Sequence, residues 1–283
     1  MTRRGVVIAA LVAAGVAVGS RWFRPGETLS AASPSASDLP DDLPDDLPGD
    51  LVVDDDGRVV GIIDGDTVEL ADGRQVRLVG TQAPKLALGR KNFTDWPLAD
   101  ESRDVLGSLV DGRSVALAFG GLREDRHGRT LAHLVDPDGR WIQGAMLAAG
   151  MSRVYTFADN RAAIGAMLGA ERVARADRLG IWDHPYYAVR NSGDLDGLTG
   201  RFELVEGRVL HAADARSGTY LNFGRDWSSD FTVFVRDEDR RTFDTGTIDL
   251  LSLEDRQIRV RGWLVDWDGP MIEVSHPEQI EVL

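Results

Sequence analysis

The sequence predicts a mainly β protein with some helix, an α+β chain of two small domains behind an N-terminal extension. Residues 51–80 and 202–274 consist of short apolar or alternating runs separated by turn residues, the pattern of antiparallel strands. Residues 98–110 and 160–178 carry apolar side chains at helical spacing. The 283 residues leave room for one large or two small domains at roughly 100–200 residues each.

Composition excludes several classes of site. The chain has no cysteine, so it holds no disulfide scaffold, thiolate metal site or cysteine nucleophile. Its net charge of -14 is unusual for a protein that binds nucleic acid. The charge is uneven, however: residues 57–190 carry 18 basic and 17 acidic side chains, whereas residues 191–283 carry 10 and 19. The central segment therefore does not repel a polyanion.

Residues 1–19 resemble an export signal. Arg3 and Arg4 precede the uncharged apolar run Gly5–Gly19, and small residues before Ser20 suit signal peptidase. The alternative is an uncleaved membrane anchor, although the run is shorter than the roughly 20 residues that span a bilayer comfortably. In a bacterial chain either reading places the folded part outside the cytoplasm. It is then periplasmic or secreted, or attached to the membrane through this segment alone.

Residues 20–50 read as a disordered acidic linker rich in proline. Between Asp38 and Pro48 an Asp-Leu-Pro unit recurs every four residues. Proline at this spacing prevents helix and interior strand, and the aspartates repel one another. A solvated spacer is the simpler interpretation, with cation binding as the alternative.

The first strands bring two carboxylates to one turn. Asp64 and Asp66 flank Gly65 after an apolar run, and Arg77 lies on the returning strand, where it can reach the same rim. Paired carboxylates beside a guanidinium suit a divalent cation next to a phosphate. Asp-Gly-Asp alone is also ordinary turn chemistry.

A wider set of motifs occurs in a fixed order. It comprises Ile63-Asp64-Gly65-Asp66-Thr67-Val68, Val76–Lys85, Asp125–Arg129, Gly139–Met151 and Gly180-Ile181-Trp182. Over residues 51–187 this set resembles the thermonuclease family, the staphylococcal nuclease-like proteins. The resemblance implies an OB-type five-stranded barrel with about three helices over residues 51–190. It also implies calcium-assisted hydrolysis of phosphodiester bonds in DNA or RNA.

The resemblance implies roles for four residues. Asp66 would bind the metal, and Asp64 would support it from behind. Arg77 would contact the phosphate, and Arg129 would stabilise the phosphorane-like transition state. Two guanidiniums suit this reaction because negative charge grows on the equatorial oxygens, where fork-shaped donors bind it.

Two residues depart from the family pattern. The family usually reads Arg-Leu-x-Gly-x-Asp-Ala-Pro-Glu, whereas here Gln82 replaces the Asp and Lys85 replaces the Glu. Gln82 offers only a neutral oxygen to a metal, and a charged lysine offers only donors. Because calcium affinity follows ligand charge, we expect weakened calcium binding. Three readings remain: a variant nuclease in which Lys85 replaces metal charge or acts as a base, a phosphate-binding site without cleavage, or a vestigial scaffold.

Two further residues are candidates for substrate contact. His127 lies in the loop of the Asp-x-x-Gly-Arg motif and can donate to a leaving group. Tyr155 follows the helix that ends near Gly150 and can line the groove.

Residues 200–283 predict a second small β domain. About five strands with antiparallel spacing loosely resemble an OB fold. OB folds often bind single strands through aromatics and a basic groove, and the aromatic candidates here are Phe223, Trp227, Trp263 and Trp267. The acidic balance opposes phosphate contact. We therefore expect a structural role or a protein partner for this domain.

The sequence as a whole predicts an exported phosphodiesterase with an altered active site and nucleic acid as its substrate. The alternative is a non-catalytic envelope protein that uses its barrels for binding or scaffolding.

Overall fold

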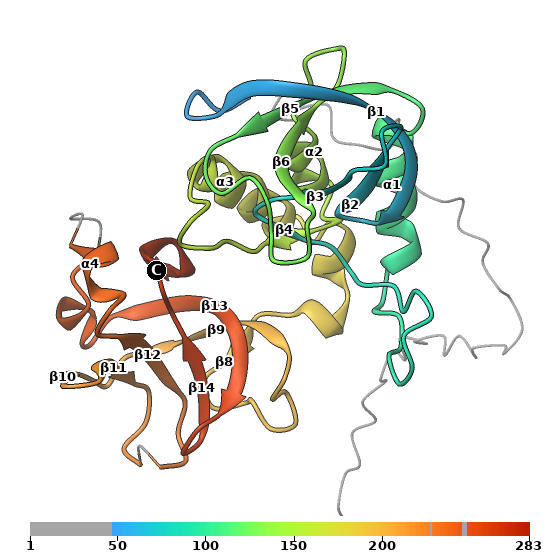
Figure 1. The fold of residues 1–283 in the computed structure, drawn as a ribbon. Coiled ribbons are helices and arrows are strands. Elements are labelled where there is room, and N and C mark those ends of the chain that lie inside the picture. Colours follow the sequence, from blue (N-terminus) through green and yellow to red (C-terminus); the bar gives the residue numbers. More distant parts are fainter. Residues whose placement is uncertain (1–46, 227, 245–247) are drawn as a thin grey trace, which may run out of the picture. The chain divides into compact units, whose positions relative to one another are not determined.

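A computed structural model describes residues 47–226, 228–244 and 248–283 (Figure 1). The predicted signal, nearly all of the predicted linker and Trp227 lie outside these ranges. Five strands close a barrel in the order β1-β2-β3-β6-β5. They are β1 (Val52–Asp64), β2 (Thr67–Leu70), β3 (Gln75–Leu78), β5 (Ser114–Phe119) and β6 (Thr130–Val135). Two short strands, β4 (Thr81–Gln82) and β7 (Arg153–Val154), form a separate antiparallel pair. This arrangement is consistent with the predicted OB-type barrel.

The barrel closes because β1 serves two neighbours. Its first half pairs with β5 from Val52 to Arg58, and its second half pairs with β2 from Val59 to Asp64. The alternation read from the sequence directs apolar side chains inward. Among those fully buried are Val68, Leu78, Leu117 and Leu134.

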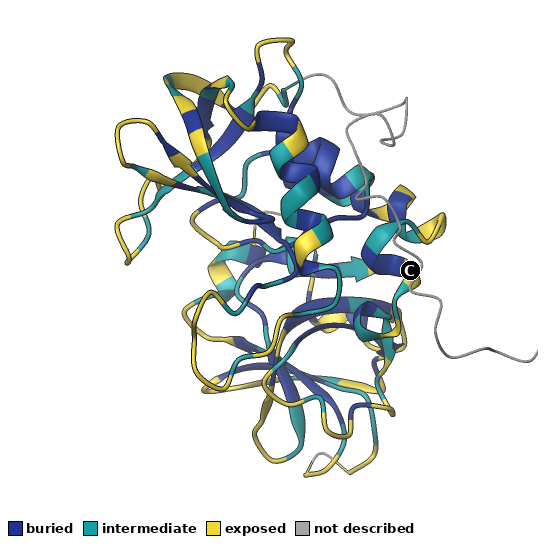
Figure 2. Ribbon diagram, turned by 90° about the vertical axis from the view of Figure 1, so that its right-hand side faces the viewer, coloured by how far each residue is buried: buried dark blue, intermediate teal, exposed yellow. Residues whose placement is uncertain are grey.

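Three helices accompany the barrel: α1 (Ala99–Val110), α2 (Ile142–Ala148) and α3 (Ile164–Ala176). The inward face predicted for α1 is confirmed, since Val105, Leu106 and Leu109 are buried in the barrel core. Six of the seven residues of α2 are buried (Figure 2). Within the described ranges no helix is long and apolar enough to cross a membrane.

The C-terminal segment forms an eight-stranded sheet with its own hydrophobic core. Its strands, here called the C-terminal sheet, are β8 (Arg190–Asn191), β9 (Phe202–Arg208), β10 (His211–Ala215), β11 (Gly218–Asn222), β12 (Thr232–Arg236), β13 (Gln257–Asp266), β14 (Pro270–Glu273) and β15 (Ile280–Val282). A short helix, α4 (Arg240–Phe243), follows β12. The single turns of 3-10 helix are Gly180–Asp183, Pro185–Tyr187, Leu251–Leu253 and Pro277–Gln279.

The five predicted C-terminal strands are present, but the sheet is not wholly antiparallel. β12 pairs with β14 and β8 pairs with β9 in parallel. The sequence does not predict strand β10, because its residues, His-Ala-Ala-Asp-Ala, are exposed or half-buried and show no apolar alternation. Strands β8 and β15 are two and three residues long, too short for a periodic pattern.

A buried ion pair joins the C-terminal sheet to α3. The guanidinium of Arg261, on β13, donates to both carboxylate oxygens of Glu171 over 2.8 and 3.0 Å. Each side chain is only 1% exposed. Arg261 also donates to the carbonyl of Val154 and to Glu281, and Glu171 accepts from the Val154 amide. The pair therefore ties strands β7 and β13 to one helix.

Replacing Arg261 with methionine should lower the free energy of unfolding by about 3–5 kcal/mol, because Glu171 then stays buried without its main cation. Urea unfolding of the purified variant measures this loss. Arg236→Met is the matched control, since its pair with Glu273 is exposed and such pairs contribute about 0–1 kcal/mol. Equal losses in the two variants would contradict a structural role for the buried pair.

Candidate functional site

The turn between β1 and β2 places Asp64 and Asp66 together at one end of the barrel. Asp64 ends β1, and its Oδ1 accepts the backbone N–H of Asp66 over 3.1 Å. Gly65 between them lies against α1, where an added Cβ would stand 2.0 Å from Ser102 Oγ. A side chain does not fit there, so the Asp-Gly-Asp sequence reflects close packing of the turn on the helix.

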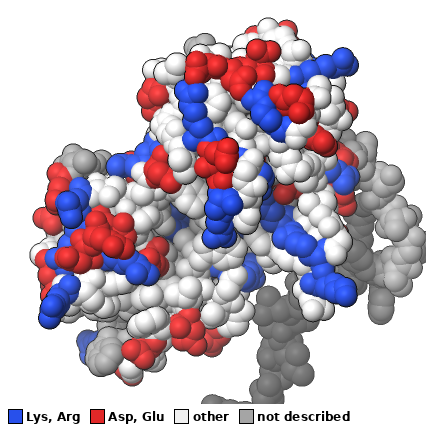
Figure 3. Space-filling view, viewed as in Figure 1, with Lys and Arg blue, Asp and Glu red and all other residues white. Residues whose placement is uncertain are grey.

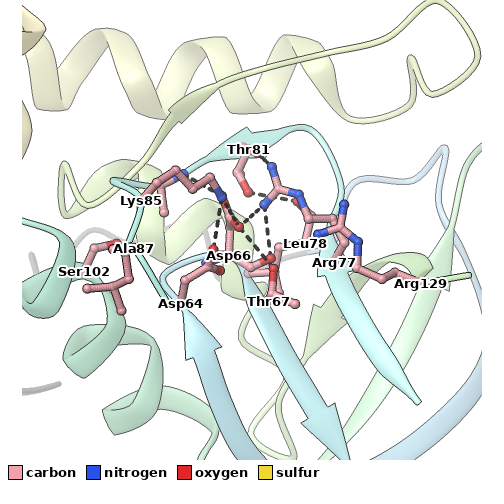
Figure 4. Close-up of polar contacts among 12 residues, drawn as sticks. Asp64, Asp66, Thr67, Arg77, Leu78, Thr81, Lys85, Ala87, Ser102 and Arg129 are labelled. Atoms are coloured by element: carbon pink, nitrogen blue, oxygen red, sulfur yellow. Dashed lines mark hydrogen bonds and ion pairs between the residues drawn. The ribbon is translucent and has the colours of Figure 1, made fainter. Parts of the chain in front are cut away.

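Asp66 is fully buried and both of its carboxylate oxygens are engaged (Figure 4). The ammonium Nζ of Lys85 stands 2.6 Å from each oxygen. The backbone N–H of Ala83 donates to Oδ2 over 2.7 Å, and Thr67 Oγ1 donates to Oδ1 over 3.2 Å. Arg77 forms an ion pair with Oδ1.

Lys85 lies between the two carboxylates. Its Nζ also contacts Asp64 Oδ2 at 3.2 Å, and its side chain is 21% exposed. An ammonium that donates to both aspartates occupies the position at which they would hold a cation. While it does so it has no lone pair with which to accept a proton.

The pKa values of the two carboxylates are shifted in opposite directions. Burial, together with the adjacent charge of Asp66, raises the pKa of Asp64 above its usual range. Burial would also raise the pKa of Asp66, but the charges of Arg77 and Lys85 outweigh it and hold that pKa well below the usual range. Asp66 is therefore the firmly ionised member of the pair.

Arg77 is fixed by the strands around it. It lies on β3 opposite Thr67 of β2. Its Nη2 donates to the carbonyl of Thr81 over 2.6 Å, and its Nη1 donates to the carbonyl of Asp66 over 3.2 Å. These bonds hold the guanidinium at the end of the barrel that carries the carboxylates.

Arg129 immediately precedes β6, which runs parallel to β3, and Figure 4 shows it beside Arg77. Its Nε and Nη2 each lie 2.7 Å from Asp125 Oδ2. The same carboxylate accepts the backbone amides of His127 and Arg129. Asp125 opens the Asp-x-x-Gly-Arg motif, but the sequence alone predicts no role for it. The structure shows that it positions Arg129.

Gln82 is turned away from the aspartates. Its Oε1 accepts from Nε and Nη2 of Arg153 over 2.9 and 2.7 Å, and both side chains are buried. Burial lowers the pKa of Arg153 to about 10, and its guanidinium lies 4.7 Å from the Phe202 ring centroid. The oxygen predicted as a metal ligand is thus already used, by a residue that sequence reasoning did not identify.

These residues do not fit a calcium ion. Calcium takes six to eight oxygen ligands, whereas the site offers two carboxylates already shared with Lys85. Among the residues with described coordinates, no group of three or more His, Cys, Asp or Glu side chains could hold a metal.

The two predicted substrate contacts lie in different settings. His127 is exposed, and its Nε2 accepts from Arg126. Figure 3 shows basic side chains on this face at the loop between β5 and β6 and at the loop after β4. Tyr155 is half-buried, and its backbone N–H donates to the carbonyl of Gly80. Its hydroxyl accepts from Trp263 Nε1 of the C-terminal sheet over 3.1 Å.

Comparison with known proteins relates the barrel to nucleases. The profile of a family described as Staphylococcal nuclease homologue matches residues 75–184. An uncharacterized endonuclease of Escherichia coli O157:H7 is 32% identical over 135 residues, covering 47% of this chain and 80% of that protein. Protein ParB of Escherichia coli is 35% identical over 141 residues, covering 46% and 73%. The profile match includes Arg77, Lys85 and Arg129, whereas Asp64 and Asp66 precede it.

The opposite pKa shifts predict opposite pH profiles for two variants. A carboxyl group whose pKa is raised on folding stabilises the fold at pH values below its unfolded-state pKa of about 4, and this stabilisation is lost as the pH rises. A carboxyl group whose pKa is lowered on folding stabilises the fold above about pH 4, and this stabilisation is lost on acidification. The unfolding free energy of Asp64→Asn, measured relative to the parent at the same pH, should therefore rise from pH 3 to pH 7. The unfolding free energy of Asp66→Asn relative to the parent should fall over the same range, to a loss of about 3–5 kcal/mol at pH 7.

Urea unfolding across this pH range measures both profiles. Curves for the two variants that run parallel would show that the aspartates are not electrostatically distinct.

Proposed function

The chain belongs to the family of Staphylococcal nuclease homologues, and from that premise we propose that it hydrolyses phosphodiester bonds in DNA or RNA without calcium. The observation that carries this proposal is the Lys85 ammonium, 2.6 Å from both oxygens of Asp66. A protein cation takes the place that the family gives to a metal. The relative named as an uncharacterized endonuclease supports the reaction class, and the side-chain contacts support its independence of calcium.

The proposed phosphate site consists of Arg77 and Arg129 on neighbouring strands β3 and β6. Their guanidiniums are planar donors that can bind two phosphate oxygens at once. Because Asp66 and Asp125 fix them before substrate arrives, they need little reorganisation as charge grows on the phosphorus oxygens. Lys85 adds a third positive charge and is itself only partly exposed. Its part in the proposed reaction is electrostatic, since it acts as a donor in this arrangement.

A second function, binding of nucleic acid without cleavage, is favoured by one specific observation. Asp64 and Asp66 both already accept from Lys85, and Asp66 also from a backbone amide and Arg77. Neither carboxylate is therefore free to take a proton from an attacking water. If this arrangement persists with substrate bound, the site holds a phosphodiester but does not activate water.

We also propose the division into a nuclease-like domain, residues 51–190, and an OB-like domain, residues 200–283. Separate hydrophobic cores support it. Only two residues separate β9 from β10, which pair with β13 and β11 respectively. If β9 and β10 count as one bent strand, the C-terminal order β10-β11-β12-β14-β13-β9 matches the barrel order β1-β2-β3-β6-β5. The parallel pair β12–β14 then corresponds to the parallel pair β3–β6 of the barrel.

Export through residues 1–19 is proposed from their sequence alone. The charged pair Arg3 and Arg4, followed by an apolar run, supports a periplasmic or secreted protein, or one held at the membrane by this segment.

Cleavage of single- and double-stranded DNA and RNA by the purified chain tests the proposed reaction. We expect equal cleavage rates in calcium and in chelator. Arg129→Ala should reduce the rate by about 10²–10³-fold, as loss of a transition-state donor does in other enzymes. Arg126→Ala is the matched control, since it removes an exposed arginine of the same loop.

Absence of cleavage from folded protein would exclude hydrolysis. Retained oligonucleotide binding, weakened by Arg129→Ala, would then favour the second function, and loss of both would leave only a scaffold.

Lys85→Glu should create a calcium site from three carboxylates. At calcium a hundredfold above the dissociation constant, we expect the variant to gain about 2.7 kcal/mol of stability. Lys85→Met is the matched control, because it removes the ammonium without adding a ligand. Gln82→Asp alone should gain nothing, since Arg153 would keep the new carboxylate. Thermal unfolding with and without calcium measures each effect, and calcium stabilisation of the parent chain would refute the proposed role of Lys85.

A further inference from the structure

The C-terminal sheet carries an aromatic surface depression far in sequence from the catalytic motifs. We call it the aromatic groove and define it by Tyr220 of β11, Phe234 of β12, Met271 of β14 and Trp267 of the β13–β14 turn. Two cavities of about 470 and 320 Å³ share three of these residues: Tyr220, Trp267 and Met271. None of the proposed active-site residues lines either cavity.

The aromatic rings of the groove form an exposed apolar surface. Tyr220 and Phe234 lie with ring centroids 4.7 Å apart and planes inclined by 34°. Trp267 is 72% exposed, the largest exposed fraction among the large hydrophobic residues of the described ranges. An exposed tryptophan beside a hollow of further aromatics is typical of an interaction site, because such apolar area is otherwise withdrawn from water.

The rim of the groove is acidic. Asp237, Glu238 and Glu273 line the larger cavity, and Asp268 lines the smaller one. Arg236 donates to both carboxylate oxygens of Glu273 over 2.6 and 2.7 Å, and Arg240 lies 3.6 Å from Asp237. These pairs still leave the rim with more acidic than basic side chains.

The pKa of the neighbouring Asp239 is affected by the same acidic side chains. Its pKa is raised by burial and by the carboxylates of Glu238 and Glu273. Residues 191–283 as a whole carry 19 acidic and 10 basic side chains. The groove therefore combines aromatic faces with negative potential.

We propose that the aromatic groove binds an arginine- or lysine-rich segment of a partner protein. A cation over an aromatic face is attracted by the ring quadrupole. The carboxylates of the rim offer only acceptors, and arginine and lysine offer only donors. The methylene stems of these side chains also cover apolar surface while their charged ends reach the rim. Charge complementarity thus selects a basic polypeptide.

Other occupants match fewer of these features. A nucleic acid also stacks on aromatics, but its phosphates would meet the acidic rim, and phosphate contact is chiefly electrostatic. A neutral saccharide would gain nothing from the excess of negative charge. Both become controls in the experiment.

Binding of labelled peptides to the full chain tests the proposal by fluorescence anisotropy. The probe is a twelve-residue peptide of alternating arginine and alanine. Matched peptides carry glutamine or glutamate in place of arginine, and the further probes are a (dT)12 oligonucleotide and a labelled neutral hexasaccharide. We expect binding of the arginine peptide alone, weakening as salt is raised. Failure of the arginine peptide to bind, or equal binding of the glutamine peptide, oligonucleotide or saccharide, would overturn the proposal.

The aromatic contribution is tested by Trp267→Ala, which should weaken peptide binding by about fivefold to tenfold. Trp263→Ala is its matched control, because Trp263 is an exposed tryptophan of β13 that lines neither cavity. Equal weakening in both variants would refute the groove as the binding site.

The contribution of the rim is tested by the double substitution Asp237→Asn with Glu238→Gln. The matched control, Asp194→Asn with Asp196→Asn, removes the same charge from exposed positions outside the groove. We expect the rim variant to lose at least about tenfold in affinity and the control to lose little. Equal losses would mean that the peptide responds only to the net charge of the domain.

Discussion

Neutralisation of one buried carboxylate organises the end of the barrel. Asp66 is removed from water, where an ionised carboxylate is stable only if charges and donors surround it. Its partners come from β2, β3 and the segment after β4, so the bonds that stabilise the charge also fix Arg77 and Lys85. The same contacts already engage the oxygens that a calcium ion would need. The proposed substrate binding and the proposed independence of calcium thus rest on one constraint.

The lysine and the glutamine that depart from the family pattern have separate structural consequences. Lys85 supplies a cation to two aspartates, whereas Gln82 supplies a neutral acceptor to the buried Arg153. An aspartate at position 82 would be an anion beside that arginine, so the glutamine makes the contact less polar. The two residues are three positions apart in sequence, yet their side chains serve different parts of the fold.

Sequence patterns predicted the strands, the helix and the motif residues that depend on the local order of the chain. Alternation located β2 and β3, helical spacing located α1, and the ordered motifs brought together Asp64, Asp66, Arg77 and Arg129. Contacts between distant residues were not predictable: Arg153 is 71 positions from Gln82, and no local pattern relates them. Only the three-dimensional structure distinguishes the environments of the aromatic candidates. Phe223 packs on Phe231 in the C-terminal core, Trp263 is 41% exposed and donates a hydrogen bond to Tyr155, and Trp267 is 72% exposed.

The pair between Glu171 and Arg261 also constrains the order of events during synthesis. The two partners are 90 positions apart in sequence, so the ribosome completes α3 well before Arg261 emerges. Until then the carboxylate of Glu171 has only Arg175 of its own helix, 3.0 Å away, as a cationic partner, and its full burial is less favourable. Domains commonly fold as they are made, N-terminal first. We therefore expect α3 to reach its final packing only after β13 is in place, when most of the chain has been translated.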